Sequence, residues 1–439
     1  MGTKELRGGS VNNIQRDFIL SYILQLYHAK QHEIKSSKSI DNELLMAFAP
    51  SDPTIAHLIL FLCIISWGSY APLRRTSPTT NGSVFGTLAF FAEFTWALFA
   101  SFTFGSIGSS PLTNNATNAT IYTHSIIFDT ENNFFHRLVT DISINPNAAL
   151  LIILGGALVG FGDSVSFTVL SYVPSSLAFP LVAGTCTAVG TVLSYAVDGS
   201  DKPYLLFAGV VLLLPSIVLL SYAQSMPSKE EKEGGTKEKE VAIKIMDTQT
   251  QKESTKTPTN SSNINSSSTT TTNNTTTNTT ATWKWVVLLI GVGIINSTWG
   301  PLSTVGRRDC SVHSAYFLLS MGRIGVQPIS QSLTQIFVFQ KTPCNLLREC
   351  YNVPRRDKLC AFGCGLLIGI GYYSYFVGSN VVNKSAAFAI SNCSPLWTIV
   401  IGVFVCKDLI RYKTKAKFAV VGSAVCYIVA VLLLTLSGT

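Results

Sequence analysis

The sequence predicts an all-α polytopic membrane protein with about ten transmembrane helices, arranged as two inverted repeats of five helices each. Three observations support this prediction. The chain of 439 residues is 47% hydrophobic and only 13% charged, whereas about 25% of residues are charged in an ordinary soluble domain. Apolar runs of about 20 residues, the length that crosses a bilayer core, recur along the chain. Short sequence patterns also recur between its two halves.

The apolar runs form two groups of five predicted spans. The spans of the first group are 56–76, 83–104, 148–172, 175–197 and 203–223. The spans of the second group are 283–304, 312–339, 358–380, 385–406 and 415–437. The predicted domains are a non-membrane tail over 1–55, a first repeat over 56–223, a linker over 224–282 and a second repeat over 283–439. The tail lacks a basic segment followed by an apolar stretch and a small-residue cleavage site, so no cleavable signal is expected.

Charge near the predicted spans indicates their orientation. The excess of Lys and Arg behind the formal charge of +8 lies in the loops after the first, fifth, seventh and ninth spans, and such loops are normally cytoplasmic. The linker 224–282 joins a KEEKEGGTKEKE run to an Asn/Ser/Thr-rich tract. Because this composition cannot bury enough apolar surface to fold, we expect a disordered cytoplasmic segment. The opposite loop, 105–147, carries Asn-X-Thr sequons at Asn115 and Asn118, which predict a glycoprotein.

Composition and motifs argue against several other classes of protein. The ten cysteines are scattered, without the paired Cys/His spacing of a zinc site, so neither a metal nor another cofactor is expected. The basic charge lies beside spans rather than on one folded face, so no nucleic-acid partner is expected. Since no HExxH or GxSxG motif occurs, we expect the protein not to be an enzyme.

An internal repeat relates the two halves of the chain. Shifting the sequence by 209 residues, without a gap, aligns Gly156, Gly160, Gly162 and Phe167 with Gly365, Gly369, Gly371 and Phe376. The same shift aligns Ser176, Ala178 and Phe179 with Ser385, Ala387 and Phe388. Trp67-Gly68 to Arg74-Arg75 similarly resembles Trp299-Gly300 to Arg307-Arg308. Two halves of five spans insert with opposite orientations, as in many secondary transporters; the alternative is that each glycine only permits close helix packing.

Two carboxylates within the predicted spans are candidates for carrying a coupling proton. Glu93 lies in the second span among small residues, and Asp163 lies in the third span on a face with Gly156 and Gly160. Charge inside a bilayer is costly and therefore often functional. Arg323 in the seventh span can pair with either acid. The paired acid would then stay ionised and structural, leaving the other to carry the proton.

The seventh span is the most polar and supplies most of the predicted substrate-binding residues. Arg323, Gln327, Gln331 and Gln335 recur every four residues and form one stripe on the helix. A glutamine amide offers both a donor and an acceptor to a substrate rich in carbonyl and N–H groups. The alternative is a structural ladder of hydrogen bonds between helices. Asn380 and Asn392 are further candidates; Asn392 precedes Pro395, where missing backbone bonds open a site or where the amide only repairs the helix.

Three stretches resemble the ureide permease family, which belongs to the drug/metabolite transporter superfamily. They are SFTFGSIGSSP at 101–111, FFHRLVTDI at 134–142 leading into GGALVGFGDS at 155–164, and SAAFAISNCSPLW at 385–397. The likeness covers 55–223 and 283–437. The family has asparagine at the position of Asp163 and an acidic residue at the position of Ala178. Its plant members also have a Walker-A-like stretch in the central loop, whereas no GxxxxGK[ST] motif occurs here.

The resemblance implies a ten-span permease that takes up allantoin, uracil and other nitrogen heterocycles with protons. The expected function is secondary-active transport of small polar solutes by alternating access, with a small molecule, protons and the lipid bilayer as partners. A sugar, nucleotide-sugar or other metabolite transporter of the same superfamily is the alternative. A non-transporting membrane receptor is disfavoured because signalling does not require an inverted repeat. The expected location is a multi-pass integral protein of the plasma membrane, or alternatively of an endomembrane.

Overall fold

The computed structural model describes most of the predicted membrane domain. The described residues are 52–77, 80–106, 108–114, 119–125, 133–169, 175–199, 202–225, 279–334, 336, 346–404 and 414–438. Residues 1–51 of the predicted N-terminal tail, the body of the predicted linker and three of the predicted site residues lie outside them; those residues are Gln335, Asn115 and Asn118.

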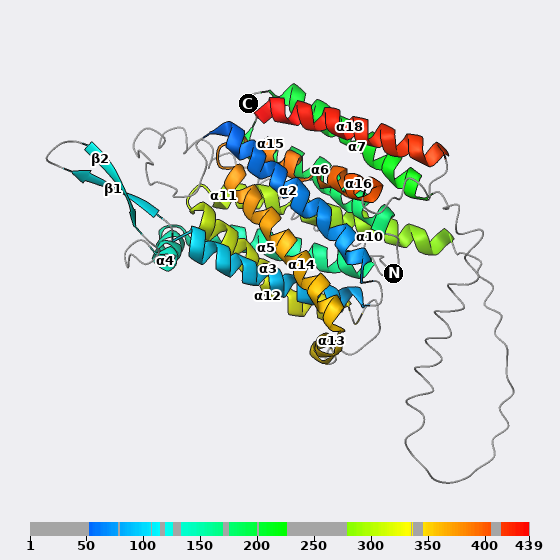
Figure 1. The fold of residues 1–439 in the computed structure, drawn as a ribbon, viewed down its shortest axis with the longest axis horizontal. Helices are drawn as coiled ribbons and strands as arrows, with labels where there is room; N and C mark the ends of the chain where they lie inside the picture. Colours follow the sequence, from blue (N-terminus) through cyan, green and yellow to red (C-terminus); the bar gives the residue numbers. More distant parts are fainter. Residues whose placement is uncertain are drawn as a thin grey trace, which may run out of the picture. The chain divides into compact units, whose positions relative to one another are not determined.

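Helices make up nearly all of the described chain (Figure 1). In the first half they are α2 (Pro53–Arg75), α3 (Gly82–Phe104), α4 (Phe134–Ile144), α5 (Pro146–Val169), α6 (Ser175–Asp198) and α7 (Pro203–Ser225). In the second half they are α10 (Thr279–Ser297), α11 (Trp299–Gly306), α12 (Val312–Thr334), α13 (Leu346–Asn352), α14 (Arg355–Gly378), α15 (Lys384–Ser391), α16 (Ser394–Phe404) and α18 (Thr414–Gly438).

A β-hairpin was not expected from the sequence. Strands β1 (Gly108–Asn114) and β2 (Ala119–Ser125) pair antiparallel, from Gly108 opposite Ser125 to Asn114 opposite Ala119. The second strand reads ATIYTHS, whose β-branched and aromatic residues favour extended backbone. The hairpin belongs to a different compact unit from the helices.

Seven helices of the described chain are long and apolar enough to cross a membrane, which confirms a helical membrane protein. They are Pro53–Arg74, Gly82–Phe104, Pro146–Val169, Leu181–Asp198, Trp285–Gly306, Arg355–Gly378 and Thr414–Ser437. The other three predicted spans correspond to α7, whose described apolar stretch is the shorter Pro203–Leu219, to α12, and to the pair α15 and α16. The ten-span count therefore stays a prediction.

For two of these three predicted spans, the sequence explains why they are not among the seven helices. Helix α12 has 23 residues, but Arg323, Gln327 and Gln331 lie on it, and this polar stripe lowers its hydropathy. The predicted span 385–406 is broken into two helices at Asn392. Pro395 lies in the first turn of α16, where a missing N–H leaves no hydrogen bond unmade.

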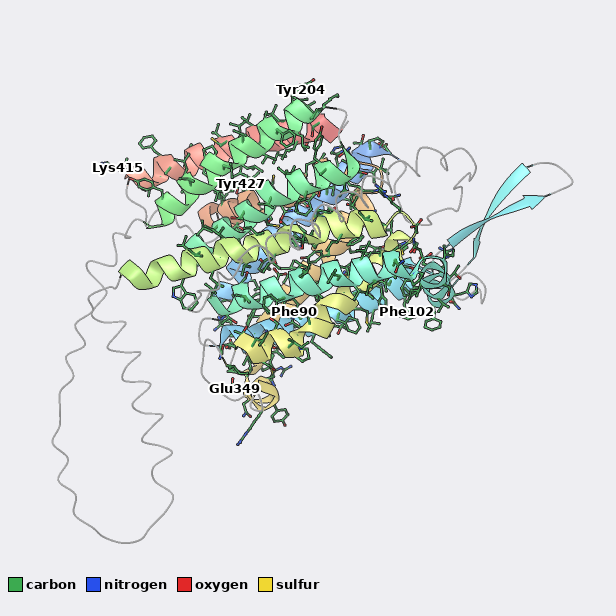
Figure 2. The ribbon with its side chains drawn as sticks, turned by 180° about the vertical axis from the view of Figure 1, so that it is seen from behind. Phe90, Phe102, Tyr204, Glu349, Lys415 and Tyr427 are labelled. Atoms are coloured by element: carbon green, nitrogen blue, oxygen red, sulfur yellow. The ribbon has the colours of Figure 1, made fainter. Side chains whose placement is uncertain are left out.

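Apolar side chains cover the outside of the helical unit, as expected of a surface that faces lipid. Leu58, Phe91 and Phe418 are each more than 60% exposed, at 64%, 63% and 74%. Figure 2 shows further outward side chains, among them Phe102 on α3 and Tyr204 at the start of α7. Such continuous apolar exposure is rare on a water-soluble protein.

The two halves interlock through helices that cross at glycines. Helix α5 packs against α10, α11 and α12, and α14 packs against α2 and α3. A Cβ placed on Gly156 of α5 would lie 2.0 Å from the carbonyl oxygen of Leu319 on α12. A Cβ on Gly365 of α14 would lie equally close, 2.0 Å, to the carbonyl oxygen of Ala89 on α3. The close backbone contact therefore requires glycine at both positions. The crossing of α5 with α12 has the same close approach as the crossing of α14 with α3.

Helices α7 and α18 run side by side along the edge of the helical unit (Figure 1). Ser216 on α7 and Ser423 on α18 are bonded to each other reciprocally. The Ser216 hydroxyl donates to the Ser423 carbonyl at 2.8 Å, and the Ser423 hydroxyl donates to the Ser216 carbonyl at 2.8 Å. Both serines are fully buried. These hydrogen bonds therefore connect α7, at the end of the first half, to α18, at the end of the second half.

Candidate functional site

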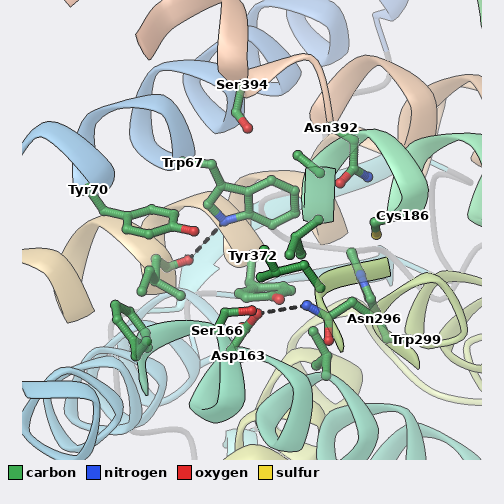
Figure 3. Close-up of a pocket in the computed structure, with 16 residues that line it drawn as sticks. Trp67, Tyr70, Asp163, Ser166, Cys186, Asn296, Trp299, Tyr372, Asn392 and Ser394 are labelled. Atoms are coloured by element: carbon green, nitrogen blue, oxygen red, sulfur yellow. Dashed lines mark hydrogen bonds between the residues drawn. The ribbon is translucent and has the colours of Figure 1, made fainter. Parts of the chain in front are cut away.

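A cavity lies where helices of both halves meet (Figure 3). Its walls come from α2, α5, α6, α10, α11 and α14, from the turn between α15 and α16, and from the start of α16. One part of the lining is aromatic and consists of Trp67, Tyr70, Phe167, Trp299 and Tyr372. The polar part consists of Asp163, Ser166, Asn296, Asn392 and Ser394. A site with flat aromatic faces and a few polar groups is typical of small-molecule binding.

Three aromatic rings meet edge to face in this cavity. The centroid of Tyr372 lies 4.9 Å from that of Trp67 and 5.1 Å from that of Trp299, and the two indoles are 6.2 Å apart. The Trp67 indole N–H donates to the carbonyl oxygen of Ile368 at 3.3 Å. A Cβ on Gly371 would lie 2.2 Å from that nitrogen. The indole of Trp67 is thus fixed by packing and by a hydrogen bond, which makes it a rigid platform.

Asp163 lies on the polar side of the cavity and is held by two partners. The side-chain amide of Asn296 donates to Asp163 Oδ1 at 2.9 Å, and Arg323 Nη2 lies 3.0 Å from Asp163 Oδ2. Figure 3 shows Tyr372 between Trp67 and the Asp163–Asn296 pair. The Asp163 side chain is 23% exposed, so the carboxylate faces the cavity.

Arg323 also pairs with Glu93, on the side away from the cavity. Its Nε lies 2.9 Å from Glu93 Oε1 and 3.0 Å from Oε2. The Glu93 and Arg323 side chains are only 2% and 1% exposed, and neither lines the cavity. The guanidinium carbon lies 4.3 Å from the centroid of the Tyr372 ring and 5.1 Å from that of Phe90. One cation is therefore enclosed by two carboxylates and two aromatic faces.

The structure thus brings together three charged residues that lie in separate predicted spans. The sequence indicated that Arg323 can pair with either acid, and in the structure it pairs with both. With all three groups ionised, the cluster carries one net negative charge, and Asp163 is its member at the cavity. Among the described residues, no group of three His, Cys, Asp or Glu side chains is placed to bind a metal ion.

Gln327 and Gln331 do not line the cavity but connect α12 to neighbouring helices. Gln327 accepts from the Ser164 hydroxyl at 2.8 Å and donates to the carbonyl oxygen of Gly160 at 3.3 Å, both on α5. Gln331 accepts from the Ser83 hydroxyl on α3 and donates to Gln327 Oε1 at 3.4 Å. Both are buried, at 5% and 0% exposed. This placement is the hydrogen-bond ladder between helices that was the alternative interpretation of the stripe.

The two predicted asparagines are placed differently. Asn392 lines the cavity at the break between α15 and α16, and its amide donates to the carbonyl oxygen of Phe388 at 2.8 Å. It therefore repairs the helix end and borders the site at the same time. Asn380 is exposed in the turn after α14, where its backbone N–H donates to Val377, and it does not line the cavity.

Sequence reasoning missed the aromatic lining and Asn296. Trp67 and Trp299 were noticed as markers of the internal repeat, but an aromatic residue in a span is usually only part of the core. Tyr372 follows a glycine-rich run and carries no motif of its own. A signal was nevertheless present, because Trp67 and Trp299 occupy corresponding positions in the two halves, and sites in inverted-repeat transporters lie where the repeats meet.

Comparisons with known proteins give little further information. No protein family model matches the chain, and no curated protein matches it. A solved structure called "Crystal structure of protein" is similar at a TM-score of 0.48 and 13% sequence identity, over 87% of this chain and 97% of that one.

Proposed function

We propose that this protein is a secondary-active transporter of small polar solutes, most suited to planar nitrogen heterocycles of the ureide and nucleobase type such as allantoin and uracil. The observation that carries the proposal is the cavity, in which rigid aromatic faces stand beside a carboxylate and two amides. The proposed mechanism is alternating access, coupled to protons, within a fold of ten helices in two inverted halves. The resemblance of three sequence stretches to ureide permeases supports the same substrate class.

Corresponding residues of the two halves line the cavity together, which supports the inverted repeat. The shift of 209 residues relates Val159 to Ile368, Asp163 to Tyr372 and Ala183 to Asn392, and Trp67 corresponds to Trp299. All eight residues line the cavity. A cavity built from paired positions lies on the pseudo-two-fold axis of such a repeat, where inverted-repeat transporters bind substrate.

The packing of α3 against α12 supports the same symmetry. The matched crossings at Gly156 and Gly365 relate Ala89 to Leu319, a shift of 230 residues. This shift relates Glu93 to Arg323, which are paired with each other.

The shift of 230 residues also relates Ser83 to His313 and Ser101 to Gln331. Correspondingly, the Ser83 hydroxyl bonds to Gln331, and the Ser101 hydroxyl donates to the carbonyl oxygen of His313 at 3.4 Å. These contacts between corresponding positions of α3 and α12 support the proposed repeat.

The chemistry of the lining favours a neutral heterocycle among the candidate substrates. A planar ring can stack on the faces of Trp67, Trp299 or Tyr372, while Asn392 offers both a donor and an acceptor. A sugar could use the same groups and is the second candidate. A nucleotide sugar fits poorly, because no Lys or Arg lines the described cavity and its carboxylate would repel phosphate.

Uptake into proteoliposomes tests the proposal. The purified protein is reconstituted and offered radiolabelled allantoin, uracil, glucose and a nucleotide sugar, with protein-free vesicles as the control. We expect saturable uptake of the two heterocycles, stimulated when the outside is more acidic than the inside. Saturable uptake of the sugar alone would replace the heterocycle with the second candidate, and uptake of none of the four by correctly folded protein would contradict the proposal.

Replacing Gln327 with leucine is expected to lower thermal stability while leaving the KM of transport close to that of wild type. Gln327 bonds to α5 rather than facing the cavity, and losing one buried hydrogen bond costs about 1 kcal/mol. Melting temperature and transport kinetics are measured on the same preparation. Ser332→Ala, which removes a bond from an exposed hydroxyl within α12, is the matched control. A raised KM at unchanged stability would instead support the substrate contact predicted from the sequence.

A further inference from the structure

Asp163 and Glu93 share one guanidinium but differ in access to the cavity. Both carboxylates lie about 3 Å from Arg323. Glu93 is enclosed between α3 and α12, whereas the Asp163 side chain is 23% exposed and faces the cavity. The cluster has one negative charge in excess, which a single proton would neutralise. Only Asp163 offers that proton a direct route from the cavity.

Asn296 supplies a second observation. Its amide N–H donates to Asp163 Oδ1 at 2.9 Å, whereas its carbonyl oxygen is buried without a hydrogen-bond partner in the described structure. That oxygen faces α5, since a Cβ on Gly162 would lie 1.8 Å from it. A buried acceptor without a partner is costly and rare in a folded protein. Asn296 therefore has an unused acceptor next to a carboxylate that faces the cavity.

We propose that Asp163 takes up the coupling proton and that the Asn296 amide turns over when it does. In the ionised state the Asn296 N–H donates to Asp163, as observed. After protonation the carboxyl O–H becomes a donor, and the amide oxygen of Asn296, turned toward it, becomes its acceptor. The oxygen and the NH₂ group are similar in size, so the clearance at Gly162 remains sufficient. This inference rests on the proposed function.

The charged groups around Asp163 are consistent with this assignment. Arg323 faces it from α12, and Glu93 lies beyond Arg323 on α3. Tyr70 on α2, Cys186 on α6 and Tyr372 on α14 line the same cavity, and phenol and thiol groups are normally neutral near pH 7. Helix α11 contains no titratable residue, and α4 joins the opposite end of α5. Arg323 and Glu93 are thus the charges that accompany Asp163 in the described structure.

The bond that changes direction also joins the two halves. Asp163 belongs to α5 in the first half and Asn296 to α10 in the second, and these helices pack against each other. Protonation also weakens the attraction of Asp163 for Arg323 on α12, because a neutral carboxyl group no longer forms an ion pair. Proton uptake at the cavity therefore alters two contacts between the halves, as a coupling site in an alternating-access transporter must.

Two transport modes measured in the same proteoliposomes test the inference. Accumulation is driven by an inward proton gradient and read with a labelled solute that wild type transports; exchange is measured at equal pH, with unlabelled solute inside. Entry of protons with the solute is followed with a trapped pH dye. Asp163→Asn should lose the gradient-driven accumulation and the dye signal, while exchange stays within about threefold of wild type. Asp163→Glu, which keeps a carboxyl group, should retain coupling, and Asn296→Leu should slow accumulation about tenfold more than exchange.

The outcomes separate this inference from the function on which it rests. If wild type neither exchanges nor accumulates any solute, the proposed function fails. If wild type does both and Asp163→Asn still accumulates solute with normal pH dependence, only the present inference is overturned. Loss of exchange in folded Asp163→Asn would also overturn it and make Asp163 a substrate ligand. If Asp163→Asn does not fold, Asn296→Leu decides: equal slowing of accumulation and exchange, or no effect on either, would contradict the inference.

Discussion

Arg323→Gln is expected to prevent most of the protein from reaching a stable folded state. The substitution leaves Glu93 and Asp163 without their shared cation, and the Glu93 side chain is only 2% exposed. Removing one partner of a buried ion pair typically costs about 3–5 kcal/mol. The measurement is the fraction of monodisperse protein after detergent extraction, together with the melting temperature of that fraction.

Charge-matched variants give this prediction a control. Glu93→Gln leaves Arg323 paired with Asp163 and should be the milder single change. The double variant Glu93→Gln/Arg323→Gln removes the enclosed charges together and should recover most of the stability lost in Arg323→Gln, as expected for directly coupled residues. If Arg323→Gln were as stable as wild type, or if the double variant were no better than the single one, the cluster would not be a coupled unit.

Trp67→Leu is expected to reduce kcat/KM for a heterocyclic substrate by about five- to tenfold, since stacking on an aromatic face is worth around 1–1.5 kcal/mol. The indole belongs to the cavity lining and is held by Ile368 and Gly371. Trp67→Phe keeps an aromatic face and should retain more activity than Trp67→Leu. Transport kinetics are measured on vesicles that contain equal amounts of each reconstituted variant.

The matched control is Phe91→Leu, an aromatic substitution on the outer face of α3, where the side chain is 63% exposed. It should leave kcat/KM unchanged. Equal activity of Trp67→Leu, Trp67→Phe and wild type would show that this ring does not contact the substrate. A loss confined to the amount of folded protein would assign Trp67 to packing alone.

The sequence predicted the helical membrane class because hydrophobicity and span length are properties of the chain itself. The sequence was less informative about polar residues in the spans, because the same residue types can bind a substrate or connect two helices. The polar stripe of Gln327 and Gln331 has the composition of a binding surface, yet these side chains satisfy Ser83, Ser164 and Gly160 on other helices. Helical spacing predicts which residues share a face, but it does not say whether that face meets a cavity or another helix.

The candidate site was predicted in part. Asp163 and Asn392 line the cavity as expected of functional residues, and Arg323 lies directly behind Asp163. That Arg323 pairs with both acids could not be foreseen, because their distances depend on how α3, α5 and α12 cross. Asn296 was overlooked because a single amide in a span carries no pattern; only its position opposite Asp163 gives it a role.

The most direct test of alternating access through this cavity is trans-stimulation of solute uptake. Vesicles containing the purified protein are loaded with unlabelled uracil, and the initial rate of labelled uracil entry is measured at equal pH on both sides. This rate is compared with the rate in vesicles that contain the protein but no internal uracil. A carrier that returns faster when occupied should show a clearly higher rate in the loaded vesicles, and Trp67→Leu should lose that increase while Phe91→Leu keeps it. If folded wild-type protein takes up no solute, or if uptake is unaffected by internal solute and by Trp67→Leu, the protein does not transport by alternating access at this cavity.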